Sequence, residues 1–358
     1  MQKIKVFEAF AGIGCQSMAL RNIGVDYEIV GISEVDKWAL LAYDAIHNEP
    51  YDIYIPSKEE MLKEFEYRHI AYNFSSGKSE MPRGIKDITK LYKAHTRSKN
   101  FGDIRLINPS ELPSMDLFTY SFPCKNISIC GKREGFNENS GTQSSLVWDC
   151  FKIIEYHKPK YLLMENVKNL VSKKFMPNFQ LILNKLEELG YNNYWKVLNG
   201  KDFGVPQNRE RVMMISIRED IDDGTFEMPN CIKLCKSIEE ILEKDIPLKY
   251  QMSEKCIAKM IKYKPKNMKE PNIFPTLTTE LSHNAGKNIT PKICMVLNEY
   301  RRLMPIECWR LMGFSDKDFY KAENIGLSDR KLYERASRGI VVPMLEEIFR
   351  NLLLADKK

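Results

Sequence analysis

The sequence predicts an α/β protein built on a mostly parallel, doubly wound sheet, joined to a second, smaller domain. Two observations predict the sheet. Short apolar runs alternate with helical segments as far as residue 217, and a glycine turn, Ala11-Gly12-Ile13-Gly14, follows the first run. A third observation predicts the smaller domain, because residues 223–300 are rich in lysine and broken by prolines.

The first elements follow directly from this alternation. Residues 4–10 form an apolar run, and the helical pattern after the glycine turn passes Met18 and Leu20 and stops at Gly24. Residues 29–32 predict a second strand and residues 38–42 the helix behind it. Residues 51–101 are polar and rich in tyrosine, so we expect an insertion between strands, formed as a helical excursion.

The later elements continue the alternation. The expected strands are residues 116–121, 161–164, 194–198 and 211–217, and the expected helices are residues 146–154 and 179–189. Apolar runs of this kind are typical of parallel strands covered on both faces, and the ligands of such sheets lie at the carboxyl ends of the strands. We therefore expect functional side chains directly after these strands.

Length and composition limit the class of protein. With 358 residues, 43% of them hydrophobic, the chain can form one large domain of residues 1–222 plus 325–358 and a smaller one of residues 223–324. No apolar run approaches the ~20 residues that span a bilayer, and the first ten residues lack the layout of a signal peptide. Nine scattered cysteines indicate reduced thiols in a cytoplasm.

Two local features have an ordinary and a functional interpretation. Cys231 and Cys235 form a lone C-x3-C, which we expect to be two buried thiols rather than a zinc site, and we predict no metal. The net charge of +6 suits a nucleic-acid binder, but many enzymes share it. The lysine run from Lys255 to Lys269 is by itself more typical of a solvated face than of a phosphate contact.

Acidic residues accompany the glycine turn. In the segment from Phe10 to Gly14, glycine lets the backbone approach a ligand at a helix N-terminus. Glu34 follows the second strand about twenty residues later, where a carboxylate can accept hydrogen bonds from ribose hydroxyls. Asp103 is a further acid, next to Ile104. Taken singly, the turn would also suit a tight loop without function, and each acid a surface carboxylate.

A thiol, a carboxyl group and two guanidinium groups lie next to the later strands. Cys124 follows Ser121-Phe122-Pro123, Glu165 follows the next apolar run, and Arg209 and Arg211 lead into another strand. This set suits attack by sulfur on a heteroaromatic ring, with a carboxyl group on a ring nitrogen and an arginine on the exocyclic oxygen. In an apolar site the acid form of the Glu165 carboxyl would be favoured. Each residue alone would more ordinarily be a structural cysteine or an ion-paired glutamate.

Six ordered blocks resemble the cytosine-5 DNA methyltransferases. They are Phe-Glu-Ala-Phe-Ala-Gly-Ile-Gly (7–14), Phe-Pro-Cys (122–124), Glu-Asn-Val (165–167), Gln-x-Arg-x-Arg (207–211), Arg-Leu-x-Pro-x-Glu-Cys (302–308) and Val-Val-Pro (341–343). They cover nearly the whole chain, and the family keeps its target-recognition region between the fourth and fifth blocks, here in the smaller domain. Residues 161–170 and the insertion are most similar to the mollicute-type enzymes that methylate CpG.

The resemblance implies a Rossmann-like enzyme that transfers a methyl group from S-adenosylmethionine to C5 of a cytosine flipped out of double-stranded DNA. Cys124 would attack C6, Glu165 would engage N3 and the 4-amino group, and Arg211 would engage O2 with Arg209 beside it. The cofactor would be held by the glycine turn, the strand ends and a C-terminal segment: Phe10, Ala11, Gly12, Ile13, Gly14, Glu34, Val35, Asp103, Ile104, Ser121, Pro123, Leu146, Gly339 and Ile340.

The same resemblance implies DNA contacts from two loops and the recognition region: Lys125, Ser128, Gln207, Thr278, Thr279, His283 and Asn284. The lysines at 255–269 would then meet phosphates. We expect a monomer, encoded by a bacterium or phage and associated with the nucleoid. It would belong to a restriction–modification system, with a cognate restriction endonuclease as a further partner.

Departures from the family pattern keep two other hypotheses open. Lys125 stands where glutamine is usual, Glu8 where aspartate is usual, and Ser337-Arg338-Gly339 where Gly-Asn-Ser is usual. They motivate a catalytically silent DNA-binding relative. The catalytic blocks also suit an RNA (tRNA) cytosine-5 methyltransferase on the same scaffold, because one flipped cytosine resembles another.

Overall fold

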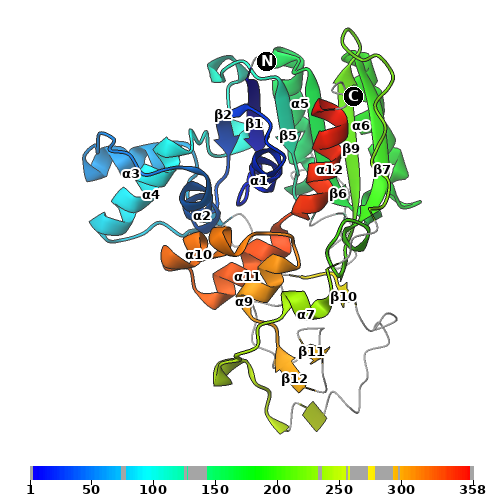
Figure 1. Cartoon of the computed structure of the whole chain (residues 1–358). Helices are drawn as coiled ribbons and strands as arrows, with labels where there is room; N and C mark the ends of the chain where they lie inside the picture. The colour runs from blue at the N-terminus through cyan, green and yellow to red at the C-terminus, as the bar shows by residue number, and fades with distance from the viewer. Residues whose placement is uncertain are drawn as a thin grey trace. The chain divides into compact units, whose positions relative to one another are not determined.

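The computed structural model describes residues 3–73, 78–124, 127, 143–232, 236–254, 257–258, 273–278, 293–296 and 299–354. The chain forms two compact units, drawn in Figure 1. Unit 1 comprises Met1–Leu198, Arg211–Pro229 and Glu346–Lys358, and unit 2 comprises Asn199–Glu210 and Asn230–Leu345. The expected domain boundaries differ from these units mainly at residues 199–210 and 325–345, which group with unit 2. The functional roles of the two domains stay a prediction.

A six-stranded sheet forms the centre of unit 1, with strand order β2-β1-β5-β6-β9-β7 (Figure 1). The strands are β1 (Ile4–Ala9), β2 (Tyr27–Ser33), β5 (Leu117–Tyr120), β6 (Tyr161–Val167), β7 (Tyr191–Asn199) and β9 (Glu210–Arg218). The first four in the order pair in parallel, and β9 runs antiparallel to β6. The predicted α/β fold with a mostly parallel sheet is confirmed.

Helices cover both faces of this sheet. On one face, α5 (Val147–His157) and α6 (Met176–Glu188) bury their apolar residues against the sheet in one continuous core. On the other face lie α1 (Cys15–Asn22) and residues 346–353 of α12 (Val342–Leu353) (Figure 1). Asn22 Nδ2 of α1 donates to Glu346 Oε1 of α12 over 2.7 Å. The short 3-10 helices of unit 1 are Ile104–Leu106, Pro109–Glu111, Gln143–Leu146 and Lys168–Val171.

The polar insertion is helical, as its sequence predicts. Two helices, α3 (Lys58–Tyr67) and α4 (Ile85–Arg97), flank a short hairpin of β3 (Tyr72–Asn73) and β4 (Lys78–Ser79). The helix α3 begins at a capping box in which Ser57 and Glu60 satisfy each other's backbone amides. Apolar residues of α3 and α4 pack with α2 (Lys37–His47) and with Ala11 of the glycine turn. The insertion is therefore part of the core around that turn.

Unit 2 is built mainly from short helices and two-stranded ladders. Its elements are a 3-10 helix (Gly200–Asp202), β8 (Gln207–Asn208), α7 (Ile238–Ile241), a 3-10 helix (Leu248–Tyr250), β10 (Phe274–Pro275), β11 (Ile293–Val296), β12 (Glu299–Arg302), α9 (Pro305–Arg310), α10 (Asp316–Asn324) and α11 (Asp329–Arg338). The fully buried Glu307 forms a bidentate ion pair with Arg301, at 2.7 and 2.8 Å. Such a pair anchors the Arg-Leu-x-Pro-x-Glu-Cys block inside the unit, because breaking it would leave a buried charge without its partner.

Three further observations concern the sequence expectations. Cys231 is exposed rather than buried, because it lies in a surface segment with the equally exposed Asn230, and Cys235 lies outside the described residues. Within the described part of the chain, no three His, Cys, Asp or Glu residues gather as metal ligands would. No helix in the same part has the length and apolarity needed to cross a membrane.

Candidate active site

The glycine turn after β1 adopts a backbone that favours glycine. Phe10, Gly12 and Gly14 all have positive φ angles, of 55°, 58° and 74°. At Gly14 an added Cβ would lie 2.3 Å from His47 Nε2 and 2.7 Å from a ring carbon of Tyr43, so this position excludes any side chain. At Gly12 the nearest atom to an added Cβ would be 4.0 Å away, which leaves open space over the backbone.

Glu34 links this turn to the end of β2. Its Oε2 accepts a hydrogen bond from Gly12 N over 2.8 Å, and its Oε1 accepts from Val35 N and Asp36 N over 2.8 and 2.7 Å. These hydrogen bonds hold the carboxylate next to the backbone of the glycine turn. Glu34 lies at the carboxyl end of a parallel strand, as its sequence position predicts.

Glu8, in the strand that leads into the glycine turn, has a buried carboxyl group. Its Oε1 accepts from both Ser17 N and Ser17 Oγ over 2.9 Å, and its Oε2 accepts from the Tyr43 hydroxyl over 2.7 Å. Burial raises the pKa of Glu8 to about 7, against the opposing effect of the hydrogen bonds from Tyr43 and Ser17. Because Ser17 lies in the first turn of α1, Glu8 joins β1 to the helix that follows the glycine turn.

Asp103 is buried at the start of the 3-10 helix that contains Ile104. Its carboxylate accepts from the Arg105 guanidinium at distances of 2.6 to 3.1 Å and lies 2.8 Å from His69 Nδ1. Burial acts to raise the pKa of Asp103, but the hydrogen bonds from Arg105 and His69 outweigh it and hold the pKa below its usual value. Sequence reasoning missed both partners. Arg105 is near enough in sequence to have been found, whereas His69 belongs to the insertion.

Glu165 and Arg211 meet at the edge of the sheet where β6 ends. Because β9 runs antiparallel to β6, its first residues lie beside the last residues of β6, and Arg211 pairs with Val167. Arg211 Nε lies 3.0 Å from Glu165 Oε1, and both side chains are largely buried. An arginine therefore lies against the largely buried Glu165 carboxyl.

Cys124 follows β5, the strand next to β6, and its thiol is half-buried and free of disulfides. Two buried side chains hold the backbone before it. Asn166 Nδ2 donates to Phe122 O over 3.1 Å, and Ser144 Oγ donates to Pro123 O over 2.7 Å. Because Asn166 is the next residue after Glu165, the same strand that carries the carboxyl group also fixes the segment that carries the thiol.

The surroundings of the cysteine add two observations. Asn169 Nδ2 donates to Ile127 O, so a third side chain holds the segment after Cys124. The hydroxyl oxygen of Ser121 is buried and has no hydrogen-bond partner among the described residues. Sequence reasoning missed Asn166, Ser144 and Asn169. The Glu-Asn-Val block contained a signal for Asn166, since a buried amide must find partners.

Arg209 and Gln207 form their hydrogen bonds within unit 2. Arg209 is buried in unit 2, where its guanidinium donates to the carbonyls of Leu277, Ser337 and Gly339 over 2.8 to 3.2 Å. Gln207 is fully buried and bridges two backbone groups of unit 2, Leu311 O and Leu277 N. Both side chains cross-link segments of unit 2, because the segment between β7 and β9 belongs to that unit, and their expected roles on the base and on DNA stay predictions.

The remaining site predictions divide into described and undescribed residues. Ile13 and Ala11 are buried in the glycine turn, Leu146 is half-buried before α5, Ile340 is buried in unit 2, and Thr278 is exposed. Lys125, Ser128, Thr279, His283, Asn284 and the lysines of the 255–269 run lie outside the described residues. Their roles stay predictions.

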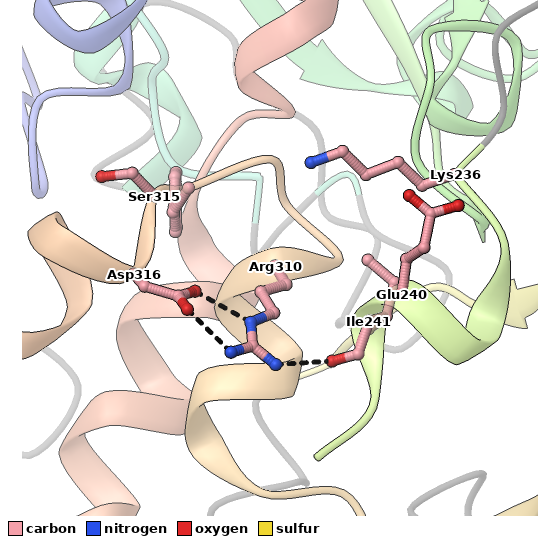
Figure 2. A pocket seen from close by; sticks show the side chains of 7 residues that line it. Lys236, Glu240, Ile241, Arg310, Ser315 and Asp316 are labelled. Carbon is pink, nitrogen blue, oxygen red and sulfur yellow. Dashed lines mark hydrogen bonds and ion pairs between the residues drawn. The ribbon is translucent and has the colours of Figure 1, made fainter. Parts of the chain in front are cut away.

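A hollow of about 340 Å³ in unit 2 is shown in Figure 2. Arg310 donates to both carboxylate oxygens of Asp316, over 2.8 and 2.7 Å, and to Ile241 O (Figure 2). It also pairs with Glu243 at 2.6 Å. Lys236 faces a lining that also contains Glu240. The acids balance the bases, so this hollow lacks the positive charge that a phosphate site needs.

Comparison with known proteins identifies the family. A family model described as C-5 cytosine-specific DNA methylase matches residues 82–354. The type II methyltransferase M2.ScrFI of Lactococcus lactis subsp. cremoris is 41% identical, over 98% of this chain and 99% of its own length. The chain belongs to the C-5 cytosine-specific DNA methylases. As a member of this family it is a DNA (cytosine-5) methyltransferase that uses S-adenosylmethionine.

Two further comparisons sharpen this assignment. The orphan methyltransferase M.SssI of Spiroplasma monobiae is 34% identical to this C-5 methylase, over 97% of this chain and 96% of its own length. The expected likeness to a mollicute enzyme is thus confirmed, although the Lactococcus relative is more similar. The crystal structure of S. pombe Dnmt2 methyltransferase matches with a TM-score of 0.67 at 16% identity, over 99% of this chain and all of that one, which supports the fold.

Proposed function

We propose that this C-5 methylase modifies a cytosine flipped out of double-stranded DNA, through a covalent adduct with Cys124. One observation carries the proposal. The thiol and the Glu165–Arg211 pair come from neighbouring strands, and Asn166 ties the two strand ends together. We refer to Cys124, Glu165 and Arg211 as the catalytic edge.

The residues around the glycine turn fit S-adenosylmethionine, which supplies the methyl group. Open space lies over Gly12, and the buried Ser121 hydroxyl has no partner among the described residues. The Glu34 carboxylate follows β2, and the Asp103 carboxylate lies at the start of a 3-10 helix. We propose that Glu34 binds the ribose and Asp103 the adenine, and refer to these two residues with Val35 and Ile104 as the adenosine end. The other proposed cofactor contacts are Phe10, Ala11, Ile13, Gly14, Pro123, Leu146, Gly339 and Ile340.

The catalytic edge would act in three steps. The Cys124 sulfur adds to C6 of the cytosine, and the ring electrons shift toward C5 and N3. Glu165 engages N3 and the 4-amino group, while Arg211 engages O2 and orients the Glu165 carboxyl. C5 then takes the methyl group, and loss of the C5 proton to a base breaks the S–C6 bond. Flipping the base costs about a few kcal/mol, which contacts around the extrahelical base must offset.

A duplex containing 5-fluorocytosine tests the covalent step. This base has no C5 proton to lose, so once C5 has taken the methyl group the S–C6 bond of the Cys124 adduct cannot be broken by elimination. Incubation of the enzyme and S-adenosylmethionine with such duplexes should give a species that migrates slowly on a denaturing gel, and Cys124→Ser should give none. An adduct on the serine variant, or none on the parent with a duplex that it methylates, would refute the proposed nucleophile.

A methyl-transfer assay distinguishes the DNA methyltransferase from the two alternative functions, the RNA enzyme and the silent relative. Labelled S-adenosylmethionine offered with duplex DNA and tRNA together should label the DNA; label in tRNA alone would favour the RNA enzyme. A silent relative would label neither and would bind S-adenosylmethionine poorly in calorimetry.

We further propose that the enzyme protects bacterial or phage DNA at the nucleoid from a cognate restriction endonuclease. The type II designation of the Lactococcus relative supports this role. Unit 2 would contribute the target recognition, and the proposed DNA contacts are Lys125, Ser128, Thr278, Thr279, His283 and Asn284. Bisulfite sequencing of DNA from expressing cells would report the modified sequence, and CpG is the sequence we expect. A digest of that DNA with an endonuclease of the same specificity should then fail.

A further inference from the structure

One turn of the insertion lies between the two segments of the adenosine end. This turn, residues 68–71, follows α3. Asp103 N donates to Arg68 O over 3.0 Å, and Ala71 N donates to Val35 O over 2.9 Å. Residues 35 and 103 are far apart in the chain, yet the backbone of a single turn is hydrogen-bonded to both. The insertion therefore sets the spacing between the Glu34 and Asp103 segments.

The turn is tightly constrained. His69 and Ala71 have positive φ angles of 54° and 59°, and residues other than glycine rarely adopt this backbone conformation. The packing supports this backbone, because Ala71 is buried in the apolar cluster that contains Ala11 of the glycine turn. On the other side, a Cβ added to Gly102 would lie 2.3 Å from Arg68 O, so the two segments touch without intervening side chains. The contact between the insertion and the adenosine end is thus close and specific.

His69 adds a side-chain contact to this backbone frame. Its Nδ1 lies 2.8 Å from Asp103 Oδ2. A carboxylate can only accept hydrogen bonds, so Nδ1 must carry the proton and donate it. The Arg105 guanidinium donates to the same carboxylate, at both of its oxygens. The imidazole in turn packs on the Tyr72 ring, with centroids 5.7 Å apart. His69 therefore fixes the direction in which the Asp103 carboxylate faces.

We propose that His69 is a positioning residue for S-adenosylmethionine, and that the insertion serves cofactor binding by holding Asp103 at a fixed distance from Glu34. The proposal rests on the proposed assignment of Asp103 to the adenine. It assigns a role to residues 51–101 that involves neither DNA nor the reacting base.

Calorimetric titration of the full-length protein with S-adenosylmethionine tests the proposal. His69→Ala should raise the Kd about tenfold, as expected when a partner that orients a binding group is removed, while kcat at saturating cofactor stays within about twofold. His69→Asn keeps a donor near Asp103 and should bring the Kd back to within about threefold of the parent. His157→Ala is the matched control, because this half-buried histidine of α5 lies 2.8 Å from Pro109 O and packs edge-on against the Tyr156 ring, with centroids 5.0 Å apart.

The outcomes distinguish the role of Asp103 in cofactor binding from the positioning role of His69. If Asp103→Asn leaves the Kd unchanged, the assignment of Asp103 to the cofactor fails. If Asp103→Asn weakens binding but His69→Ala does not, only the positioning role of His69 is overturned. Equal losses in His69→Ala and His69→Asn would also overturn it, because they would indicate a steric role of the ring. Thermal unfolding of each variant checks that the fold is retained.

Discussion

The adenosine end and the catalytic edge both belong to unit 1 but are held in different ways. At the adenosine end, the carboxylates themselves bind the surrounding chain: Glu34 accepts from three backbone amides and Asp103 from Arg105 and His69. At the catalytic edge, the thiol of Cys124 is positioned through its backbone, which Asn166 and Ser144 hold. The Cys124 thiol, which reacts, is thus not one of the groups that hold the backbone of Phe122 and Pro123.

This difference predicts which quantity each substitution changes. A substitution at the catalytic edge removes a group that takes part in the reaction but leaves the hydrogen bonds of Asn166 and Ser144 in place. The kcat should therefore fall, while the Kd for S-adenosylmethionine should stay nearly constant. A change at the adenosine end removes a ligand contact and a structural contact together, so binding should weaken first. The four predictions below are ordered from the largest expected effect to the smallest.

Cys124→Ser should abolish methyl transfer, because a serine hydroxyl is a far weaker nucleophile than a thiolate. The backbone contacts of Phe122 and Pro123 do not involve the sulfur, so the Kd for S-adenosylmethionine should stay within about threefold. Transfer of labelled methyl groups and calorimetry measure the two quantities. Turnover of Cys124→Ser at the parental rate would contradict the assignment of the nucleophile and with it the proposed difference between the two regions.

Glu165→Gln should lower kcat by about 10²- to 10³-fold, the usual range when a group that handles a proton is lost. The amide keeps a hydrogen-bonding shape beside Arg211, so the fold and the cofactor Kd should be retained. Steady-state kinetics at saturating cofactor provide the measurement. Glu155→Gln, on the exposed side of α5, is the control. A raised Kd with normal kcat would assign Glu165 to the wrong end of the site.

Glu34→Gln should produce the opposite result. It removes the charge that accepts from three backbone amides and the proposed ribose contact, so we expect the Kd for S-adenosylmethionine to rise about tenfold. The kcat at saturating cofactor should change by less than about twofold. Comparing kcat with the Kd from calorimetry distinguishes the two. Loss of kcat alone would erase the proposed difference between the two regions.

Glu8 predicts a pH effect on stability. Its pKa is raised from 4.5 to about 7 in the folded protein by burial. The folded state therefore holds a proton that the unfolded state loses between pH 4.5 and about 7, so this group makes the protein less stable as pH rises through that window. The penalty above pH 7 is on the order of 3 kcal/mol.

Glu8→Gln should remove this dependence. The variant carries no titrating carboxyl, so its Tm relative to the parent should improve between pH 5 and pH 8, even if lost hydrogen bonds lower both values. Thermal unfolding at the two pH values measures the change, with the exposed Glu187→Gln of α6 setting the baseline. An unchanged Tm difference between the two pH values would mean that the buried carboxyl is ionised at little cost.

The comparison of the two regions also separates local from long-range information. The strands of the sheet, the turn at Gly12 and Gly14, and the placing of Cys124 after a strand were all predicted, because apolar periodicity and the conformational freedom of glycine are properties of short segments. The helical character of the insertion was predicted on the same basis. The family followed from six ordered blocks, and the comparisons confirm it.

Partners across the chain could not be predicted in this way. Arg209 and Arg211 are two residues apart in one block, yet the first cross-links carbonyls of unit 2 and the second pairs with Glu165 in unit 1. His69 and Asp103 are 34 positions apart, and the chain between them carries no pattern that predicts their contact. The reason is physical: a local pattern determines which face of an element is buried, whereas the antiparallel direction of β9 and the packing of the insertion against α2 decide which side chains meet. For this protein, the sequence by itself determined the family, the elements of the sheet and the candidate nucleophile. Only the tertiary structure decided which charged groups hold one another in place.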